Sequence, residues 1–391
     1  MSSDGSGPDS AGPDSIGTVA DLHAAAARLT GLSDFGEDDY TDGLTVLLGS
    51  YAGEAGLTAR GVRAARAMLR GALTARLLSE HGWAQHPEHA SVPIERPVFV
   101  TGLPRTGTTA LHRLLTADPE HQGLELWLAE VPQPRPPREA WPTDPVFQLI
   151  QAGVSKHQVD HPEFMGVHFM AADQVEECWQ LLRQSMRSVS WECLAHLPSY
   201  SSWLATQDWT GAYWRHRRNL QLIGLADRSR RWVLKNPSHL FALDALLRVY
   251  PDALIIQTHR APRTAIASVC SLAAQATEGW STTFRGEVIG AGQLELWARG
   301  LESFTAARSR HDPAQFFDVG YDDFAADPLA TVAAIYRHFG LTLSGQAAAA
   351  MRALTGGSTG GRPAHRYSLA DFGLTGEQVD ERFAGCQHLP A

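Results

Sequence analysis

The sequence predicts an α/β protein in which helices cover both faces of a central, mostly parallel sheet, in a three-layer αβα arrangement. Three observations lead to this prediction. A Gly-rich turn joins an apolar strand to a helix at residues 96–115. Short apolar segments alternate with helical patterns between residues 231 and 340. Residues 18–85 are rich in Ala and Leu and contain no Pro. Strands separated by helices are typical of a parallel sheet covered on both faces.

The N-terminal segment predicts helices that precede the sheet. In the stretch GVRAARAMLRGALTARLLSEHGW, apolar residues recur at spacings of three and four: Ala65, Met68, Leu69, Leu73 and Leu77. This spacing places them on one face of an amphipathic helix. We therefore expect a helical preface at residues 18–92. Residues 1–17 consist mainly of Ser, Gly, Asp and Pro, and a disordered tail is expected there.

The remaining chain is expected to form one domain over residues 18–391, with an α/β core at residues 93–345. Its later strands are short and apolar: 231–235, 252–260 and 314–321. Helices are expected at 239–250, from Pro262 onward, at 294–311 and at 328–340, where Gly340 ends the last one. The Trp-rich residues 146–228 predict a helical insertion, the Pro-rich residues 126–145 an extended segment, and residues 346–391 a C-terminal loop and helix.

Composition excludes several classes of protein. The net charge of −9 and a pI of about 6.0 argue against a nucleic-acid partner. No segment approaches the roughly 18 apolar residues of a membrane-spanning helix, and the N-terminus lacks a secretory pattern. The cysteines are widely spaced and predict reduced thiols: Cys178, Cys193, Cys270 and Cys386. We expect a soluble, cytoplasmic protein without a membrane partner, and no feature of the sequence specifies its oligomeric state.

The stretch RPVFVTGLPRTGTTALHRLL at residues 96–115 predicts an anion-binding loop. An apolar strand ends at Gly102, and Gly107 precedes a helix with an apolar stripe. Such a turn directs several backbone N–H groups and the positive end of a helix dipole toward one point. Glycines allow the backbone to approach a ligand closely. An ordinary strand-to-helix turn would not require the added hydroxyls and basic residue, so the combination favours an anion site.

Polar side chains of this loop indicate which anion it holds. Thr106, Thr108 and Thr109 supply hydroxyl donors, and Arg105 supplies the cation. In phosphate loops of the G-x-x-x-x-G-K-[ST] type, a Lys occupies the place of Thr108 and spans the β- and γ-phosphates. That Lys is missing here, and no apolar strand ends in an Asp suited to Mg²⁺. The loop therefore favours transfer of a less charged group, such as a sulfuryl group, without a metal.

With these motifs the chain resembles the sulfotransferases that use 3′-phosphoadenosine 5′-phosphosulfate, and in particular a bacterial branch with an N-terminal helical segment. GLPRTGTTALHRLL resembles the 5′-phosphosulfate loop of that family. The resemblance covers about residues 96–370 and implies a P-loop-like fold, the phosphosulfate as donor, adenosine 3′,5′-bisphosphate as product and no metal. It also implies the residues that contact the 5′ side of the donor: Gly102, Arg105, Thr106, Gly107, Thr108 and Thr109.

Three further stretches resemble the family's contacts to the rest of the donor. THRAPRTAIASV is similar to the 3′-phosphate motif and implies Arg260 and Ser268 as its ligands. An Arg guanidinium also suits phosphate on physical grounds, because its planar fork matches two oxygens. DVGYDDFAADP implies that Tyr321 packs near the adenine. The Gly-rich stretch GGRPAHRYS resembles the C-terminal basic loop over the 3′-phosphate: Arg362, His365 and Arg366.

VLKNPSHL occupies the place of a second basic motif of the family. Lys235 lies 25 residues before Arg260, a spacing similar to that of the cytosolic branch. The resemblance implies that Lys235 and Arg105 stabilise charge that develops during transfer. The cytosolic branch has its catalytic His two residues after this Lys, where Pro237 stands here, and the nearest histidine is His239.

The base that deprotonates the acceptor therefore has several candidates. His239 and His168 are favoured because the ordinary pKa of histidine lies near neutrality. Glu125, Glu176 and Glu177 are the carboxylate alternatives, and other branches place a glutamate base near the position of Glu125. The Trp residues of the insertion could line the acceptor pocket, although Trp at such spacing more often packs in a core.

We interpret the chain as a sulfotransferase that acts on a hydroxyl of a small molecule, including natural-product and carrier-bound hydroxyls of secondary metabolism. One alternative is a kinase or nucleotidase that uses Mg-ATP, which would require a Lys in place of Thr108. A second alternative is a non-catalytic module that binds adenosine bisphosphate. That module would not need Arg105, Lys235 and a basic histidine together.

Overall fold

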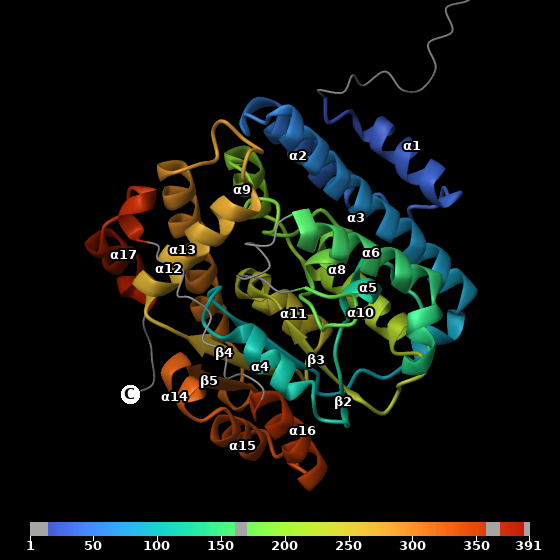
Figure 1. Ribbon diagram of the computed structural model, residues 1–391, viewed down its shortest axis with the longest axis vertical. Coiled ribbons are helices and arrows are strands. Elements are labelled where there is room, and N and C mark those ends of the chain that lie inside the picture. Colours follow the sequence, from blue (N-terminus) through green and yellow to red (C-terminus); the bar gives the residue numbers. More distant parts are fainter. Residues whose placement is uncertain (1–14, 161–169, 357–367, 387–391) are drawn as a thin grey trace, which may run out of the picture.

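Five parallel strands form one central sheet in the computed structural model, which describes residues 15–160, 170–356 and 368–386. The strand order is β2-β3-β1-β4-β5 (Figure 1). The strands are β1 Val98–Gly102, β2 His121–Gln122, β3 Arg231–Lys235, β4 Leu254–His259 and β5 Phe316–Gly320. β1 pairs with β3 on one side and β4 on the other, so the carboxyl ends of all three lie together. Sites in α/β proteins form at this edge, where the strand order reverses.

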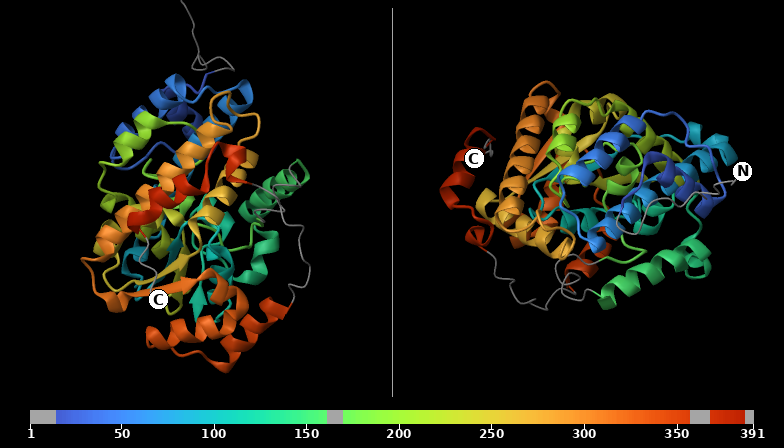
Figure 2. Two further views of the ribbon diagram at one scale, coloured as in Figure 1. Left: turned by 90° about the vertical axis from the view of Figure 1, so that its left-hand side faces the viewer. Right: turned by 90° about the horizontal axis from the view of Figure 1, so that it is seen from above.

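Alternation along the strands separates two hydrophobic cores. Val98 and Val100 of β1 pack in one core, and Phe99 packs in the other. The first core is completed by helices α4 Thr108–Leu115, α14 Tyr321–Ala326, α15 Pro328–His338 and α16 Gly345–Gly356. The second is completed by α10 Thr210–Ile223, α11 Leu243–Val249, α12 Pro262–Ala276 and α13 Glu287–Arg308. The predicted three-layer α/β fold is confirmed (Figures 1 and 2).

The helices that precede β1 in the sequence, and those of the insertion between β1 and β3, pack on the second core. The N-terminal helices are α1 Val19–Thr30, α2 Thr41–Gly53 and α3 Ala59–Gln85, followed by the 3-10 turn η1 Pro87–Ser91. Between β1 and β3 lie α5 Leu126–Glu130, η2 Arg138–Thr143, α6 Pro145–Asp160, α8 Trp179–Arg183 and α9 Pro198–Leu204. The remaining elements are η3 Pro237–Phe241, η4 Pro313–Gln315, η5 Leu369–Phe372, α17 Gly376–Phe383 and η6 Ala384–Cys386.

Arg76 of α3 ties the N-terminal helices to the insertion. Its side chain is fully buried. The guanidinium donates hydrogen bonds to the backbone carbonyls of Phe35, Glu37 and Gln184, and it forms an ion pair with Asp39 at 2.8 Å. These partners come from the segment after α1 and from the segment after α8. One buried cation therefore holds together three parts of the chain that are distant in sequence.

Two regions differ from the sequence-based expectation. The Pro-rich segment 126–145, predicted to be extended, contains α5 and η2. α5 forms because it ends before Pro132, so its backbone N–H groups are intact. Residues 239–250, predicted as one helix, divide into η3 and α11 at Ala242, whose φ of −142° and ψ of 39° are not helical.

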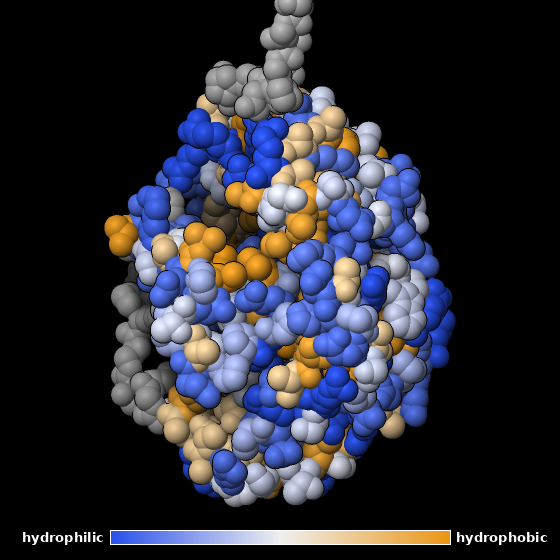
Figure 3. Space-filling view, turned by 90° about the vertical axis from the view of Figure 1, so that its right-hand side faces the viewer, coloured by the Kyte–Doolittle hydropathy of each residue, from blue (hydrophilic) through white to orange (hydrophobic). Residues whose placement is uncertain are grey.

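The surface is mostly polar, with hydrophobic side chains gathered in places. Figure 3 shows the side that lies on the right in Figure 1, where hydrophobic side chains border a hollow in the upper half. Helix α6 carries two exposed apolar side chains, Leu149 and Val159. Among the described residues, no helix is both long enough and apolar enough to cross a bilayer.

Candidate active site

The turn between β1 and α4 has the backbone of an anion-binding loop. Gly102, Arg105 and Gly107 have φ values of 143°, 71° and 90°. A Cβ on Gly102 would lie 2.5 Å from the Thr258 carbonyl oxygen, so only glycine fits beside β4. Left-handed residues within such a turn direct neighbouring N–H groups into one concavity. The first turn of α4 adds N–H groups that have no partner within the helix.

The Thr106 hydroxyl holds this loop to the sheet. It donates to the Leu103 carbonyl at 2.6 Å and lies 2.5 Å from the hydroxyl of Thr258 on β4. Thr106 is 1% exposed, so its hydroxyl faces inward. We therefore no longer assign a phosphate contact to this hydroxyl, although the loop backbone remains a donor. The sequence analysis missed Thr258. It lies two residues before Arg260, and this spacing places both side chains on the same face along the strand direction, which could have indicated it.

Four of the predicted donor-binding residues converge on the loop. The Arg105 guanidinium donates from Nε to the Ser268 hydroxyl at 3.1 Å. Arg260 donates to the Arg105 carbonyl at 3.0 Å, and its guanidinium lies 3.9 Å from the centre of the Tyr321 ring. A Cβ on Gly107 would approach that ring to 3.2 Å, so the ring lies against the loop. Arg105, Arg260 and Tyr321 follow the carboxyl ends of β1, β4 and β5, and Ser268 lies on α12.

Lys235 lies beside this cluster in an ion pair with Glu177. The Lys235 side chain is 1% exposed and that of Glu177 13% exposed. The ammonium donates to Glu177 Oε1 and, at 3.2 Å, to the hydroxyl of Thr109 in the first turn of α4. The Cys178 N–H donates to the Lys235 carbonyl at 3.1 Å, which anchors the segment that carries Glu177 to the end of β3. A carboxylate, an ammonium and a hydroxyl therefore meet at the mouth of the loop.

The other two carboxylate candidates have different surroundings. Glu125 accepts two hydrogen bonds from Arg135, at 2.9 and 3.2 Å. The same guanidinium also pairs with Asp227, in the turn that precedes β3. Glu125 is therefore part of a structural ion cluster. Glu176 is buried, and its Oε1 accepts the Glu177 N–H at 3.1 Å. Of the three carboxylates, Glu177 forms an ion pair with Lys235.

His239 lies in the second hydrophobic core. Its Nδ1 is 2.7 Å from the Tyr213 hydroxyl, and its ring packs edge-on to Phe99 at 5.0 Å. It is 1% exposed, and burial, followed by the neighbouring His216, holds its pKa well below the ordinary value. The Lys235 side chain contacts α4, on the other face of the sheet. This position does not suit a base, and we no longer propose His239 in that role.

Four predicted residues lie outside the described residues: His168, Arg362, His365 and Arg366.

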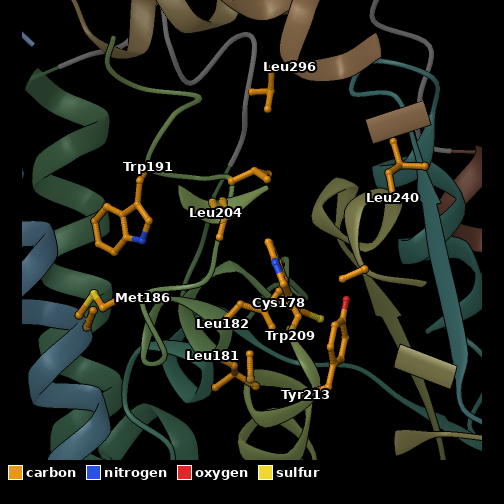
Figure 4. Close-up of a cluster of buried hydrophobic side chains, with 14 of the residues drawn as sticks. Cys178, Leu181, Leu182, Met186, Trp191, Leu204, Trp209, Tyr213, Leu240 and Leu296 are labelled. Atoms are coloured by element: carbon orange, nitrogen blue, oxygen red, sulfur yellow. The ribbon is translucent and has the colours of Figure 1, made fainter. Parts of the chain in front are cut away.

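Tryptophans of the insertion pack mainly in the interior. Trp191 and Trp209 are buried in the same cluster as Leu182 and Tyr213 (Figure 4). Trp179 and Trp203 are partly buried against that cluster. The structure thus supports the packing interpretation for these side chains.

Buried neutral histidines predict a pH-dependent stability. Burial lowers the pKa of His216 to about 3 and holds the pKa of His239 well below its usual range. Unfolded histidines take up protons near pH 6.5, so below this pH the unfolded state binds more protons and stability falls. We expect the free energy of unfolding to drop by about 3 kcal/mol for the pair between pH 7.5 and 5.5. Denaturant titrations at both pH values measure the change, and His216→Asn should reduce the drop by about 1.4 kcal/mol. Equal stability of the wild type at both pH values would contradict this prediction.

No group of three or more His, Cys, Asp or Glu side chains that could hold a metal ion occurs within residues 15–160, 170–356 and 368–386.

Known proteins resemble this chain in sequence and in structure. A profile described as the sulfotransferase family matches residues 97–345. Omega-hydroxy-beta-dihydromenaquinone-9 sulfotransferase Stf3, from Mycobacterium bovis and Mycobacterium tuberculosis, is 26% identical over 264 residues. This match covers 64% of the chain and 64% of each relative, which is less than two thirds of their length.

Two crystal structures superpose closely on the chain. Sulfotransferase STF1 from Mycobacterium tuberculosis is 61% identical with a TM-score of 0.90, over 95% of this chain and 100% of that one. Sulfotransferase STF9 from Mycobacterium avium is 29% identical with a TM-score of 0.86, over 94% of this chain and 95% of the other.

Proposed function

The chain belongs to the sulfotransferase family, and from this premise we propose that it transfers a sulfuryl group from 3′-phosphoadenosine 5′-phosphosulfate to a hydroxyl of a small-molecule acceptor. The observation that carries this proposal is the convergence of Arg105, Arg260, Ser268 and Tyr321 on one loop, with the Lys235–Glu177 pair at its mouth. We propose that the reaction takes place in the cytoplasm. We also propose that the protein has no nucleic-acid partner, which its net charge of −9 supports.

The polar groups around the loop fit a doubly phosphorylated nucleotide. Two guanidiniums, an ammonium and several hydroxyl and backbone donors face one small region, and cationic donors bind phosphate oxygens strongly. The loop N–H groups with Thr108 and Thr109 would hold the 5′ side. Arg260 and Ser268 would hold the 3′-phosphate. The Tyr321 ring, against which the Arg260 guanidinium packs, would lie near the adenine of the donor.

The phosphosulfate, when bound, supplies an activated sulfuryl group. We assign proton acceptance to Glu177, because an ionised carboxylate can only accept hydrogen bonds and Lys235 fixes its orientation. The acceptor hydroxyl loses its proton to Glu177 as its oxygen forms the new bond to sulfur. The bond from sulfur to the 5′-phosphate oxygen breaks at the same time. Lys235 and Arg105 donate to oxygens on which negative charge grows, which lowers the barrier.

The acceptor approaches from the side of α8. Glu177 stands two residues before this helix, and the backbone of Cys178 fixes it to the end of β3. A hydroxyl that reaches Glu177 must therefore lie between the loop and the helical insertion. Mass spectrometry of a cell extract incubated with the enzyme and labelled phosphosulfate would identify the acceptor as a product heavier by one sulfate.

Loss of the 3′-phosphate contact tests the donor part of the proposal. Arg260→Gln should weaken the binding of adenosine 3′,5′-bisphosphate by about 10- to 100-fold, because a hydrogen bond to a charged group contributes roughly 1.5–3 kcal/mol. Titration calorimetry measures the dissociation constant.

The matched control is Arg263→Gln, three residues along the chain. Arg263 is exposed and pairs with Asp380 instead of facing the loop. It should bind the bisphosphate as the wild type does. Equal affinity in wild type and Arg260→Gln would reject this assignment of the 3′ site. Turnover of Mg-ATP without any sulfated product would favour the kinase alternative.

A further inference from the structure

A cavity lies at the opposite edge of the sheet from the loop between β1 and α4. It has a volume of about 830 Å³ and is bordered by His89, Trp214, Arg217, Arg218, Arg248 and Asp252. Asp252 stands just before β4, whereas Arg260 follows the end of that strand. The six residues of β4 separate the two regions by roughly 20 Å. This cavity is therefore distinct from the proposed donor site, and its volume suits a whole small molecule.

Arginines without acidic partners face this cavity. Arg217 packs on the Tyr250 ring at 5.3 Å, and Arg218 packs on the Trp83 ring at 3.8 Å. Within the described residues neither one forms an ion pair, and the one further contact is Arg217 to the Val249 carbonyl at 3.5 Å. A guanidinium that stacks on a ring through its face keeps its N–H groups available at its edge. Both side chains are therefore oriented but retain donors for a ligand.

Arg248 and Asp252 are the other charged side chains that border the cavity. Arg248 is 60% exposed, donates to Thr210 at 2.8 Å and contacts Asp208 at 3.5 Å. Asp252, which also borders the cavity, accepts a hydrogen bond from the Arg96 N–H at 2.7 Å. The lining thus holds three guanidiniums and the Asp252 carboxylate, and Asp208 offsets part of the charge of Arg248. Such a concentration of positive charge in a concave site attracts anions.

Two aromatic side chains indicate that the ligand is more than a simple ion. Trp214 borders the cavity and is 50% exposed, although tryptophan is normally well buried. His89 is 4% exposed, and its Nδ1 donates to the His86 carbonyl at 2.8 Å. Its other ring nitrogen, Nε2, is buried and has no partner among the described residues. An exposed indole provides a surface on which a planar ring can stack.

We propose that this cavity binds a small organic polyanion that carries a planar ring and at least two phosphate or sulfate groups. Arg217, Arg218 and Arg248 hold the anionic groups, and Trp214 stacks on the ring. The site is independent of the donor loop, so the chain holds two anion sites on opposite edges of one sheet.

ATP and inorganic tripolyphosphate are suitable probes for this site. Calorimetry is performed on the full chain at low salt, with saturating adenosine 3′,5′-bisphosphate present to occupy the donor loop. We expect ATP to bind, and the double variant Arg217→Gln/Arg218→Gln to weaken it at least tenfold. Trp214→Ala should weaken ATP severalfold but leave tripolyphosphate unchanged. Thermal unfolding of each variant checks that the fold is retained.

The matched control is Arg63→Gln/Arg70→Gln, which removes two exposed arginines of α3 outside the cavity. It should bind ATP as the wild type does. The inference is overturned if neither probe binds at millimolar concentration, or if both double variants weaken ATP equally. It is also overturned if Arg260→Gln abolishes ATP binding, because the probe would then occupy the donor loop. If adenosine 3′,5′-bisphosphate itself failed to bind the wild type, its own titration would show this. That result would contradict the proposed function and not the second anion site.

Discussion

Glu177→Gln is expected to lower kcat by about 10²- to 10⁴-fold, the usual contribution of a general base. The affinity for adenosine 3′,5′-bisphosphate should stay within about twofold. Glutamine keeps the size of the side chain and can still accept a hydrogen bond from Lys235, but its neutral amide cannot take a proton from the acceptor. Product formation from labelled phosphosulfate measures kcat, and calorimetry measures the bisphosphate affinity. The ion pair of Glu177 with Lys235 and the closeness of Thr109 support this expectation.

Two controls separate this effect from a general loss of structure. Glu139→Gln makes the same chemical change at an exposed position and should leave kcat unchanged. Lys235→Met should also lower kcat strongly, and because the two side chains contact each other, the double variant should lose less than the product of the single effects. Near wild-type turnover in Glu177→Gln would show that another group is the base. His168 would then be the next candidate.

Arg76→Met should lower the free energy of unfolding by about 2–4 kcal/mol, because several hydrogen-bond acceptors lose a buried donor. The reason lies in the groups that the guanidinium serves. The partly exposed Asp39 would lose its cation, the buried carbonyl of Gln184 would lose a donor, and so would the part-buried carbonyl of Phe35. Denaturant unfolding followed by tryptophan fluorescence measures the change.

Arg70→Met is the matched control, since it makes the same substitution at an exposed position of the same helix. It should change stability by less than about 0.5 kcal/mol. Equal stability of Arg76→Met and Arg70→Met would mean that the buried hydrogen bonds contribute little to the attachment of the N-terminal helices.

Regular elements of the fold could be predicted where their pattern is local. β3 coincides with the predicted residues 231–235, and α12 begins at Pro262 as expected. The two-residue strand β2 could not be predicted, because a period-two pattern needs more residues than it has. The short helices of the insertion could not be predicted either. α8, for example, has only five residues and depends on packing against the second core.

The sequence predicted which residues of the candidate site come together where their position depends on the ends of strands. Arg105, Arg260 and Tyr321 follow three different strands, and parallel strands bring their carboxyl ends together. The direction of each side chain was not predictable. The Thr106 hydroxyl faces inward and His239 lies in a core because of residues from other elements, Thr258 and Tyr213. Glu177 could not be singled out either, since its partner Lys235 is 58 residues away in sequence.

The contact between Arg260 and Tyr321 has a consequence for how the protein is made. β5, which leads into Tyr321, pairs with β4 only after most of the chain has been synthesised. A nascent polypeptide that stops before residue 316 lacks the ring beneath the guanidinium and the last strand of the sheet. The proposed bisphosphate binding therefore requires residues 316–321, and protection of nascent chains of increasing length by the bisphosphate against a protease would test this requirement.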